Sequence, residues 1–339
     1  MQSRNRRVLT HSACCVAWLL IEDHMTTAFV FPGQGSQVVG MGKALATAYP
    51  AAMRVFDEVD AALSQKLSAL MWEGPEADLT LTENAQPALM AVSMAALKVL
   101  ETEHGITVAN NAKFVAGHSL GEYVALAAAG TFSLADTARL LKIRGKAMQA
   151  ATPVGTGAMA AILGLDFATT AAIAAEAAQG DVCQAANDNT DGQVVISGSK
   201  AAVDRACEIA KAKGAKRAIL LPVSAPFHCA LMQPAADVMA NALASVTMNS
   251  PCVPLIANVV AGPLTDVATI RAKLVEQVTG TVRWRECVSY MTQHSVKVFV
   301  EIGAGKVLTG LAKKNAPEAV AMACGTPDDI AAVAAQLKV

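Results

Sequence analysis

The sequence lacks the features that mark a membrane protein or a nucleic-acid-binding protein. No apolar run reaches the ~18 uninterrupted residues that a membrane-spanning helix needs. Lys and Arg number 27 and Asp and Glu 28, so the formal net charge is −1 and no overall field draws the chain to nucleic acid or to an anionic membrane surface. We therefore expect no nucleic acid and no membrane among its partners.

Cysteine is present but unpatterned. The eight cysteines form no Cys-x-x-Cys pair and are scattered through apolar segments. Zinc sites and disulfide frameworks both show regular cysteine spacings, so we expect reduced thiols, no metal and a cytoplasmic location. What the chain does have is apolar surface to bury: 53% of its 339 residues are hydrophobic, which is enough for one large domain or two moderate ones.

Residues 1–24 differ from the rest of the chain. Three arginines precede an apolar stretch in a pattern that mimics a signal peptide, but no A-x-A-like cleavage site follows. Met25 directly precedes the strand-like run "TTAFVF". We interpret residues 1–24 as a leader created by an upstream start codon rather than as an export signal.

The order of helical and strand-like runs predicts two structural parts. Residues 26–151 alternate short β-type runs with long Ala-rich helical patterns, as does the chain after residue 224, which is typical of a mostly parallel sheet covered by helices. Residues 152–224 read β-α-β-β-α-β, the ferredoxin-like order, with a turn expected at "DNTDG" (188–192). We predict an α/β protein with a large domain at 25–151 and 225–339 and a small ferredoxin-like domain at 152–224.

A candidate nucleophile lies in "GHSLG" (117–121). A strand-like run ends at Gly117 and a helical run begins at Leu120, which is the arrangement that exposes a serine hydroxyl above a sheet. The N-terminus of the helix would also direct N–H groups at an anion forming beside Ser119. The spacing alone occurs as often in a tight turn without chemistry, and a serine needs a base to react near neutral pH.

The base must come from six histidines. Two lie in the leader and one lies in a polar turn. His118, next to the serine, is expected to be packed or hydrogen-bonded rather than basic. His228 lies where a strand ends and a helix begins, whereas His294 precedes a strand and is expected to be exposed, so position favours His228 but leaves His294 open.

The glycine-rich loop "FPGQGSQVVG" (31–40) suggests a dinucleotide site but departs from its pattern. The motif Gly-x-Gly-x-x-Gly needs a third glycine, and Val38 occupies that place. We therefore expect no nicotinamide or flavin. A loop rich in backbone N–H groups can instead face an oxyanion.

Several motifs together make the chain resemble one family. Between residues 26 and 325 it is similar to the malonyl-CoA:acyl carrier protein transacylases of bacterial type II fatty acid synthesis, in the segments "FVFPGQGSQ", "GHSLGEY", "RGKAMQ", "GTGAMAAILG", "GQVVISG", "PFHCALM" and "EIGAGKVLTGL". The resemblance implies an α/β-hydrolase-like core with an inserted ferredoxin-like subdomain. It also implies that no cofactor is needed, since the coenzyme A thioester is a substrate.

The same resemblance assigns the catalytic roles. It implies that Ser119 accepts the acyl group, that His228 is its base, and that the main-chain carbonyl of Gln277 orients the imidazole. The oxyanion hole would use the backbone N–H groups of Gln34 and Leu120.

Substrate selection is implied by two further matches. Arg144 matches the arginine that binds the malonyl carboxylate, and a planar guanidinium is suited to that task because it forms two parallel hydrogen bonds. Asn189 matches a polar residue on the small-domain side of the cleft. Phe227 resembles the aromatic residue before the histidine in malonyl-selective enzymes, and Ala304 departs from the usual proline in "EIGAGK".

The implied reaction is a two-step transfer. The malonyl group of malonyl-CoA passes to Ser119 and then to the phosphopantetheine thiol of acyl carrier protein, with ping-pong kinetics. A trans-acting polyketide-type acyltransferase would differ only in its carrier. A thioesterase or esterase would let water remove the acyl group and would use an Asp with a late histidine, for which only His294 is available. A scaffold without catalysis would not need Ser119, His228 and Arg144 together.

Overall fold

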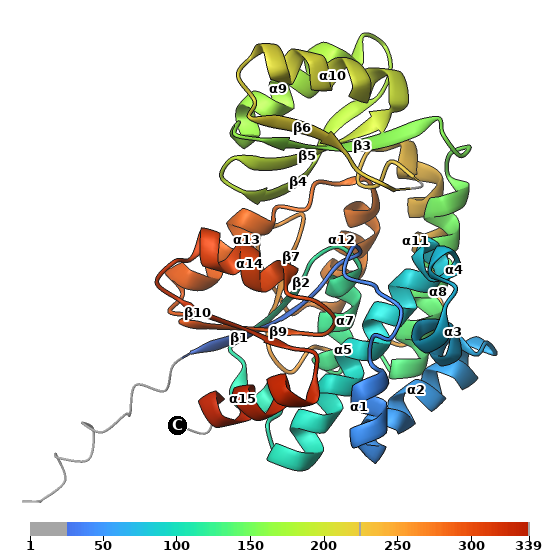
Figure 1. Cartoon of the computed structure of the whole chain (residues 1–339), viewed down its shortest axis with the longest axis vertical. Helices are drawn as coiled ribbons and strands as arrows, with labels where there is room; N and C mark the ends of the chain where they lie inside the picture. Colours follow the sequence, from blue (N-terminus) through green and yellow to red (C-terminus); the bar gives the residue numbers. More distant parts are fainter. Residues whose placement is uncertain (1–25, 224, 338–339) are drawn as a thin grey trace, which may run out of the picture.

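Two sheets organise the computed structural model, which describes residues 26–223 and 225–337 (Figure 1). The interpretation of residues 1–24 as a leader lies outside the described residues. Sheet A has the strand order β10-β9-β1-β2-β7-β8 over those ranges, and sheet B has the order β4-β5-β3-β6. The expected mixed α/β fold, with a mostly parallel sheet and a separate antiparallel one, is confirmed.

Sheet A is parallel except at one edge. β1 pairs with β2 and β9, β9 pairs with β10, and β2 pairs with β7, all in parallel, while β8 runs antiparallel to β7. The strands of this sheet are β1 (Thr27–Phe31), β2 (Phe114–Gly117), β7 (Leu255–Ala257), β8 (Gly262–Leu264), β9 (Val298–Ile302) and β10 (Val320–Cys324).

Helices cover both faces of sheet A because its strands are apolar on both sides. Phe29 and Phe31 of β1 belong to the larger apolar cluster, whereas Ala28 and Val30 point to the opposite face and a smaller cluster. The smaller cluster includes residues of α13 (Trp284–Gln293) and α14 (Val307–Asn315). The helices that contribute to the larger one are α1 (Lys43–Ala48), α2 (Pro50–Leu63), α3 (Leu67–Glu73), α4 (Glu76–Thr80), α5 (Thr82–His104), α6 (Val108–Asn111), α7 (Leu120–Ala128), α8 (Leu134–Ala150), α11 (Gln233–Ala244), α12 (Val267–Thr279) and α15 (Pro327–Leu337).

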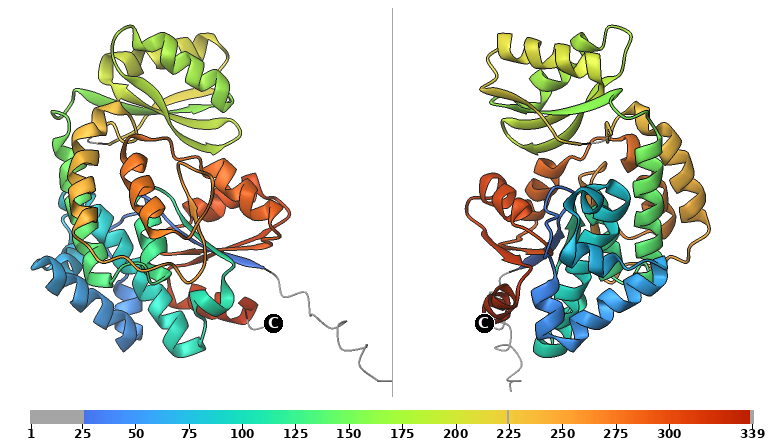
Figure 2. Two further views of the ribbon diagram at one scale, coloured as in Figure 1. Left: turned by 180° about the vertical axis from the view of Figure 1, so that it is seen from behind. Right: turned by 45° about the vertical axis from the view of Figure 1, so that its right-hand side comes forward.

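Sheet B and the two helices packed on it lie above the part of the molecule that contains sheet A (Figure 2). Its strands are β3 (Gly157–Leu163), β4 (Cys183–Thr190), β5 (Gln193–Ser199) and β6 (Arg217–Leu220), and its helices are α9 (Phe167–Ala178) and α10 (Lys200–Ala212). One face packs on these helices through residues such as Ile162. Met159 and Val195, on the opposite face, join the larger apolar cluster of the rest of the molecule.

The expected turn at residues 188–192 was wrong in its extent. β4 continues as a strand to Thr190, with two irregularities in its pairing to β5, and only the last two residues turn. This polar run can be buried because residues outside sheet B form hydrogen bonds with it. The Asp188 N–H, for example, donates to the Val282 carbonyl at 2.9 Å. A segment whose composition is typical of loops therefore forms a strand where sheet B meets the rest of the molecule.

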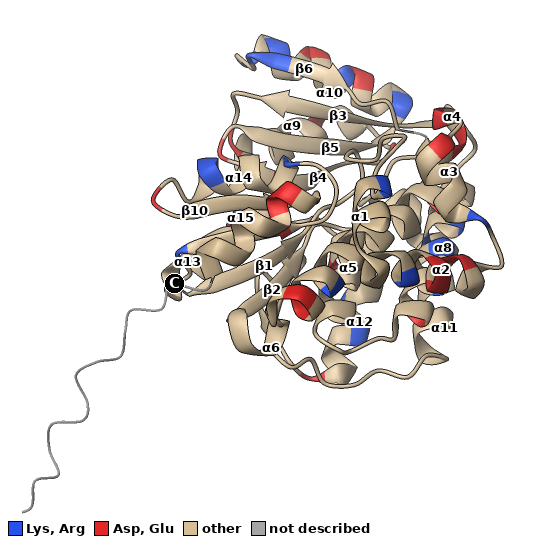
Figure 3. Ribbon diagram, turned by 60° about the horizontal axis from the view of Figure 1, so that its bottom comes forward, with Lys and Arg blue, Asp and Glu red and all other residues tan. Residues whose placement is uncertain are grey.

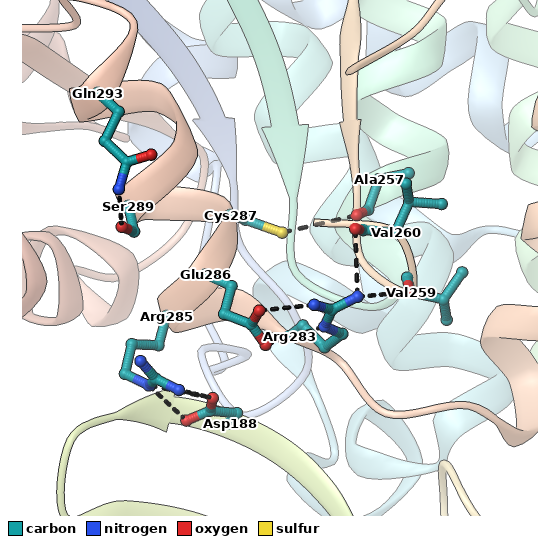
Figure 4. Close-up of polar contacts among 10 residues, drawn as sticks. All are labelled: Asp188, Ala257, Val259, Val260, Arg283, Arg285, Glu286, Cys287, Ser289 and Gln293. Carbon is teal, nitrogen blue, oxygen red and sulfur yellow. Dashed lines mark hydrogen bonds and ion pairs between the residues drawn. The ribbon is translucent and has the colours of Figure 1, made fainter. Parts of the chain in front are cut away.

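An ion pair also joins the two parts (Figure 4). Arg285 of α13 donates to both carboxylate oxygens of Asp188 at 2.8–3.1 Å, and the Asp188 side chain is only 2% exposed. Burial raises the pKa of Asp188, and the Arg285 guanidinium opposes that rise. The neighbouring Arg283 holds Glu286 and the carbonyls that follow β7, so the segment before α13 is fixed on both sides.

Other global features agree with the composition. In Figure 3, the positions of Lys and Arg are interspersed with those of Asp and Glu along the ribbon. Within the described ranges, no helix has the length and apolarity required to cross a bilayer. The six cysteines in those ranges are free.

Candidate active site

The serine lies on a strained elbow at the carboxyl end of β2. Ser119 has φ 55° and ψ −110°, a conformation that a residue with a side chain adopts only when its surroundings impose it. A Cβ on Gly117 would collide with the backbone of Gly121, and a Cβ on Gly121 would collide with the Phe31 carbonyl. Both glycines of the motif are therefore required by the close approach of β1, β2 and α7.

A histidine contacts the serine hydroxyl. His228 Nε2 lies 2.7 Å from Ser119 Oγ, and His228 Nδ1 lies 2.9 Å from the main-chain oxygen of Gln277. Because a carbonyl only accepts, Nδ1 carries the proton and Nε2 is free to accept from the serine. Burial, and next the positive charge of Arg144, lower the pKa of His228 to about 3, so the imidazole is neutral at physiological pH.

The other two histidines considered above have different surroundings. His294 is exposed at the end of α13, where its ring stacks on Tyr290 at 4.0 Å and its Nδ1 lies 2.8 Å from the Tyr290 carbonyl. His118 is hydrogen-bonded as expected, with Nε2 2.9 Å from Asn189 Oδ1, yet it also lines the cavity that contains Ser119. Burial lowers the pKa of His118.

A buried arginine faces the same serine. Arg144 is 1% exposed, and its guanidinium donates to Gln86 Oε1 at 2.8 Å, to Gln277 Oε1 at 3.0 Å and to Ser119 Oγ at 3.1 Å. It also lies 5.6 Å from the centre of the Tyr123 ring. All these partners are neutral, and over residues 26–223 and 225–337 no ion pair joins Arg144 to a carboxylate. Glu122 attracts Arg144 electrostatically but forms no ion pair with it, so the guanidinium can still pair with an anion that enters the cavity.

The cavity lies between the two parts of the molecule and has a volume of about 480 Å³. Ser119, His228 and Arg144 line it from the large part, and Met159 and Asn187 line it from sheet B. The remaining lining residues include both residues expected at an oxyanion hole, Gln34 after β1 and Leu120 at the start of α7, together with Phe227.

Asn189 does not line the cavity. Its side chain contacts His118, and its main-chain oxygen accepts from Asn315 Nδ2 at 2.8 Å. Asn187, two positions earlier on β4, lines the cavity instead. The pairing of β4 with β5 skips Asn189 between Asp188 and Thr190, so the usual alternation of side chains is interrupted at this residue.

Sequence reasoning missed the buried polar side chains behind the site. Asn258, after β7, accepts from the Ser119 N–H at 2.8 Å and donates to the Gly117 carbonyl at 2.7 Å. Gln86, within α5, accepts from Arg144, and Glu122 is fully buried in the first turn of α7. The available signal was a polar residue inside an apolar run, as in "LIANVV" for Asn258.

No side-chain cluster suited to a metal ion occurs in the described part of the chain. The polar groups nearest the Ser119 hydroxyl are instead the neutral His228 imidazole and the Arg144 guanidinium, and amide side chains and Glu76 also line the cavity. This set is typical of enzymes that attack a carbonyl with a serine and form a covalent acyl intermediate.

Comparison with known proteins identifies the family. A model of the acyl transferase domain matches residues 28–327, and the chain belongs to this family. Malonyl CoA-acyl carrier protein transacylase of Escherichia coli K12 is 49% identical over 305 residues, which is 90% of this chain and 97% of the relative. The resemblance inferred from sequence motifs is confirmed.

Two solved structures extend the comparison. The acyl-carrier-protein-S-malonyltransferase of Bartonella henselae has 57% identity and a TM-score of 0.91, over 93% of this chain and 100% of its own. A malonyl-transacylase in complex with a type II PKS acyl-carrier protein has 43% identity and a TM-score of 0.88, over 91% and 99%. The fold and the family are thus shared across the length of these relatives.

Proposed function

We propose that this enzyme transfers the malonyl group from malonyl-CoA to the phosphopantetheine thiol of acyl carrier protein through a malonyl-Ser119 ester. The observation that carries the proposal is the buried Arg144 beside the Ser119–His228 pair, which no carboxylate contacts within the described residues. Malonyl differs from acetyl by one carboxylate, and Arg144 is the cation within reach of the serine. The names of the relatives agree with this choice of substrate.

In the first half-reaction, His228 Nε2 takes the hydroxyl proton as Ser119 Oγ attacks the malonyl thioester carbon. The carbonyl oxygen becomes an oxyanion, which the backbone N–H groups of Gln34 and Leu120 stabilise. When the intermediate collapses, the carbon–sulfur bond breaks, and protonated His228 gives its proton to the coenzyme A thiolate. The Gln277 carbonyl, which accepts from Nδ1, stabilises the transient imidazolium.

The second half-reaction reverses these steps with a different thiol. The phosphopantetheine thiol gives its proton to His228 and attacks the malonyl ester, and Ser119 leaves with the proton returned to its oxygen. Each acyl group is therefore bound covalently to Ser119 before the second substrate reacts, which gives ping-pong kinetics. No metal or redox cofactor takes part in this scheme.

Carrier choice is the main alternative. A polyketide-type acyltransferase would use the same residues with another carrier, and one solved relative is bound to a type II PKS carrier protein. We favour the fatty acid carrier because the sequence motifs resemble the transacylases of bacterial type II fatty acid synthesis, and the Escherichia coli relative is 49% identical whereas the PKS-bound relative is 43% identical. A thioesterase that uses His294 as its base is not supported, since that side chain is exposed and absent from the cavity wall.

The choice of acyl group is a separate question. Phe227, which lines the cavity, supports malonyl over methylmalonyl as the substrate.

The same proposal covers the domain architecture and the location. We propose a hydrolase-like core at 25–151 and 225–339 with a ferredoxin-like domain at 152–224, supported by the order β4-β5-β3-β6 and the element sequence β-α-β-β-α-β. We also propose a cytoplasmic location, supported by free rather than paired cysteines in the described residues.

The test of the proposed function follows both fates of the acyl group. Malonyl-CoA labelled in the malonyl group is incubated with the enzyme, with and without phosphopantetheinylated acyl carrier protein, and malonyl-carrier and free malonate are both measured. We expect carrier-dependent transfer with little free malonate and no transfer by Ser119→Ala. Rapid release of malonate without carrier would identify a hydrolase.

A further inference from the structure

The backbone of Ser119 is held from both sides by two buried amide side chains. Its N–H donates to Asn258 Oδ1 at 2.8 Å, and its carbonyl accepts from Gln277 Nε2 at 2.9 Å. The positive φ of this serine is unfavourable for a residue with a Cβ, so it persists only where the surroundings impose it. Asn258 and Gln277 supply that constraint at the peptide groups on either side of the Ser119 Cα.

Both of these residues are tied to one oxygen. Glu122 Oε2 accepts from the Asn258 main-chain N–H at 3.1 Å and from Gln277 Nε2 at 2.9 Å. Glu122 is 0% exposed and does not line the cavity. Its other oxygen, Oε1, has no hydrogen-bond partner in the described part of the chain.

The contact between Glu122 Oε2 and Gln277 Nε2 also favours one orientation of the Gln277 side-chain amide. Nε2 lies beside three acceptors, the Ser119 carbonyl, Glu122 Oε2 and, at 3.4 Å, Asn258 Oδ1, and Oε1 lies 3.0 Å from Arg144. A flipped amide would bring oxygen against these acceptors and would bring NH₂ against a guanidinium that can only donate. Glu122 therefore helps to aim the Gln277 oxygen at Arg144.

We propose that Glu122 is a positioning residue for the reaction: through Oε2 it holds Asn258 and Gln277, and these hold the Ser119 backbone in its reactive conformation. The inference rests on the proposed role of Ser119 as acyl acceptor. The required property is a single accepting oxygen at the right place rather than a negative charge. Two observations support that distinction: Oε1 is unpartnered, and burial raises the pKa of Glu122 to about 7 despite the nearby Arg144.

Three variants separate acceptor position from charge. Glu122→Gln keeps one carbonyl oxygen at full side-chain length and removes the charge. Glu122→Asp keeps the charge but withdraws the carboxylate by one methylene. Glu122→Ala removes the acceptor, and if it fails to fold, the aspartate variant carries the test.

The measurements are kcat and KM for malonyl-CoA and acetyl-CoA, and the rate at which an arylsulfonyl fluoride modifies Ser119. We expect Glu122→Asp and Glu122→Ala to lower kcat for both substrates and the modification rate by about 10²-fold, because misplacing a reacting group by about 1 Å has an effect of that size. KM should change little, and Glu122→Gln should stay close to wild type. Acetyl-CoA and the sulfonyl fluoride carry no carboxylate, so a shared loss is assigned to the serine and not to Arg144.

Coupling provides a readout that a purely structural role would not move. The double variant Glu122→Ala/Asn258→Ala should lose less activity than the two single losses combined, since Asn258 is one of the two residues through which Glu122 acts on Ser119. The proposal is overturned if Glu122→Asp keeps wild-type kcat, if Glu122→Gln falls as far as Glu122→Asp, if only KM changes, or if the two losses add. Ser119→Ala is the control for the proposed function: if it still becomes malonylated, that function fails, while the sulfonyl fluoride rates continue to test Glu122.

Discussion

Replacing Arg144 by alanine should separate malonyl transfer from acetyl transfer. The substitution removes a guanidinium that is 1% exposed, donates to Gln86, Gln277 and Ser119, and has no carboxylate partner within the described ranges. In the proposed complex the malonyl carboxylate supplies the missing negative charge. After the substitution that carboxylate would enter the cavity without a counter-ion.

The size of the effect follows from the burial of the pair. Truncating one partner of a buried, hydrogen-bonded charge pair costs about 2–5 kcal/mol. At about 1.4 kcal/mol for each factor of ten, kcat/KM for malonyl-CoA should fall by about 30-fold to several thousand-fold. Acetyl-CoA has no carboxylate to lose, and the enzyme no longer buries an unpaired cation beside it, so acetyl transfer should hold steady or rise. Arg144→Lys should rescue malonyl transfer only in part, because it keeps the charge but not the two parallel donors.

The assay is kcat/KM for both thioesters with wild type, both Arg144 variants and a matched control. Arg139→Ala is that control, because Arg139 lies on the same helix, is 54% exposed and pairs with Asp136 at the surface. It should leave both values near wild type. A parallel loss of malonyl and acetyl transfer in Arg144→Ala would refute the carboxylate role and would assign Arg144 to the fold or to coenzyme A.

Three further predictions concern the base, the pH profile and the link between the two parts. His228→Ala should slow acylation by about 10²- to 10⁴-fold in single-turnover measurements, whereas His294→Ala should remain near wild type; the reverse order would favour a hydrolase. Because the pKa of His228 is lowered to about 3, kcat/KM should show no loss centred near pH 6.5 as the pH falls from neutral, and a midpoint there would show that the resting imidazole titrates normally. Arg285→Ala leaves the Asp188 carboxylate buried without its partner, so the free energy of unfolding measured with urea should fall by about 1–3 kcal/mol; an unchanged value would mean that the ion pair contributes nothing net.

The elbow could be predicted from sequence because its causes are local. Gly117 and Gly121 are required by close backbone approach, and the flanking runs already indicate a strand and a helix. His228 could be favoured over His294 by its place at the end of a strand. The sequence of its own helix could not identify Arg144 as a site residue. Isoleucine is usually buried and arginine usually exposed, but here Ile143 is exposed and Arg144 is buried. Its proposed role came from the resemblance.

The polar network could not be predicted because each member depends on partners far away in the chain. Asn258 holds the backbone of Ser119 from 139 positions away, and Gln86 meets Arg144 from 58 positions away. A buried amide is recognisable only once those partners are placed. The two edge strands of sheet A, β8 and β10, were also not predicted. β8 has only three residues, and β10 is rich in small side chains, so neither has the composition typical of a strand.

The most direct test of the central claim is the mass of the intact protein after incubation with malonyl-CoA without carrier protein, followed by peptide mapping. We expect one added malonyl group, located on Ser119, that disappears when phosphopantetheinylated acyl carrier protein is added. Ser119→Ala should show no added mass. A malonyl group on another residue, or transfer to carrier protein by Ser119→Ala, would contradict the account.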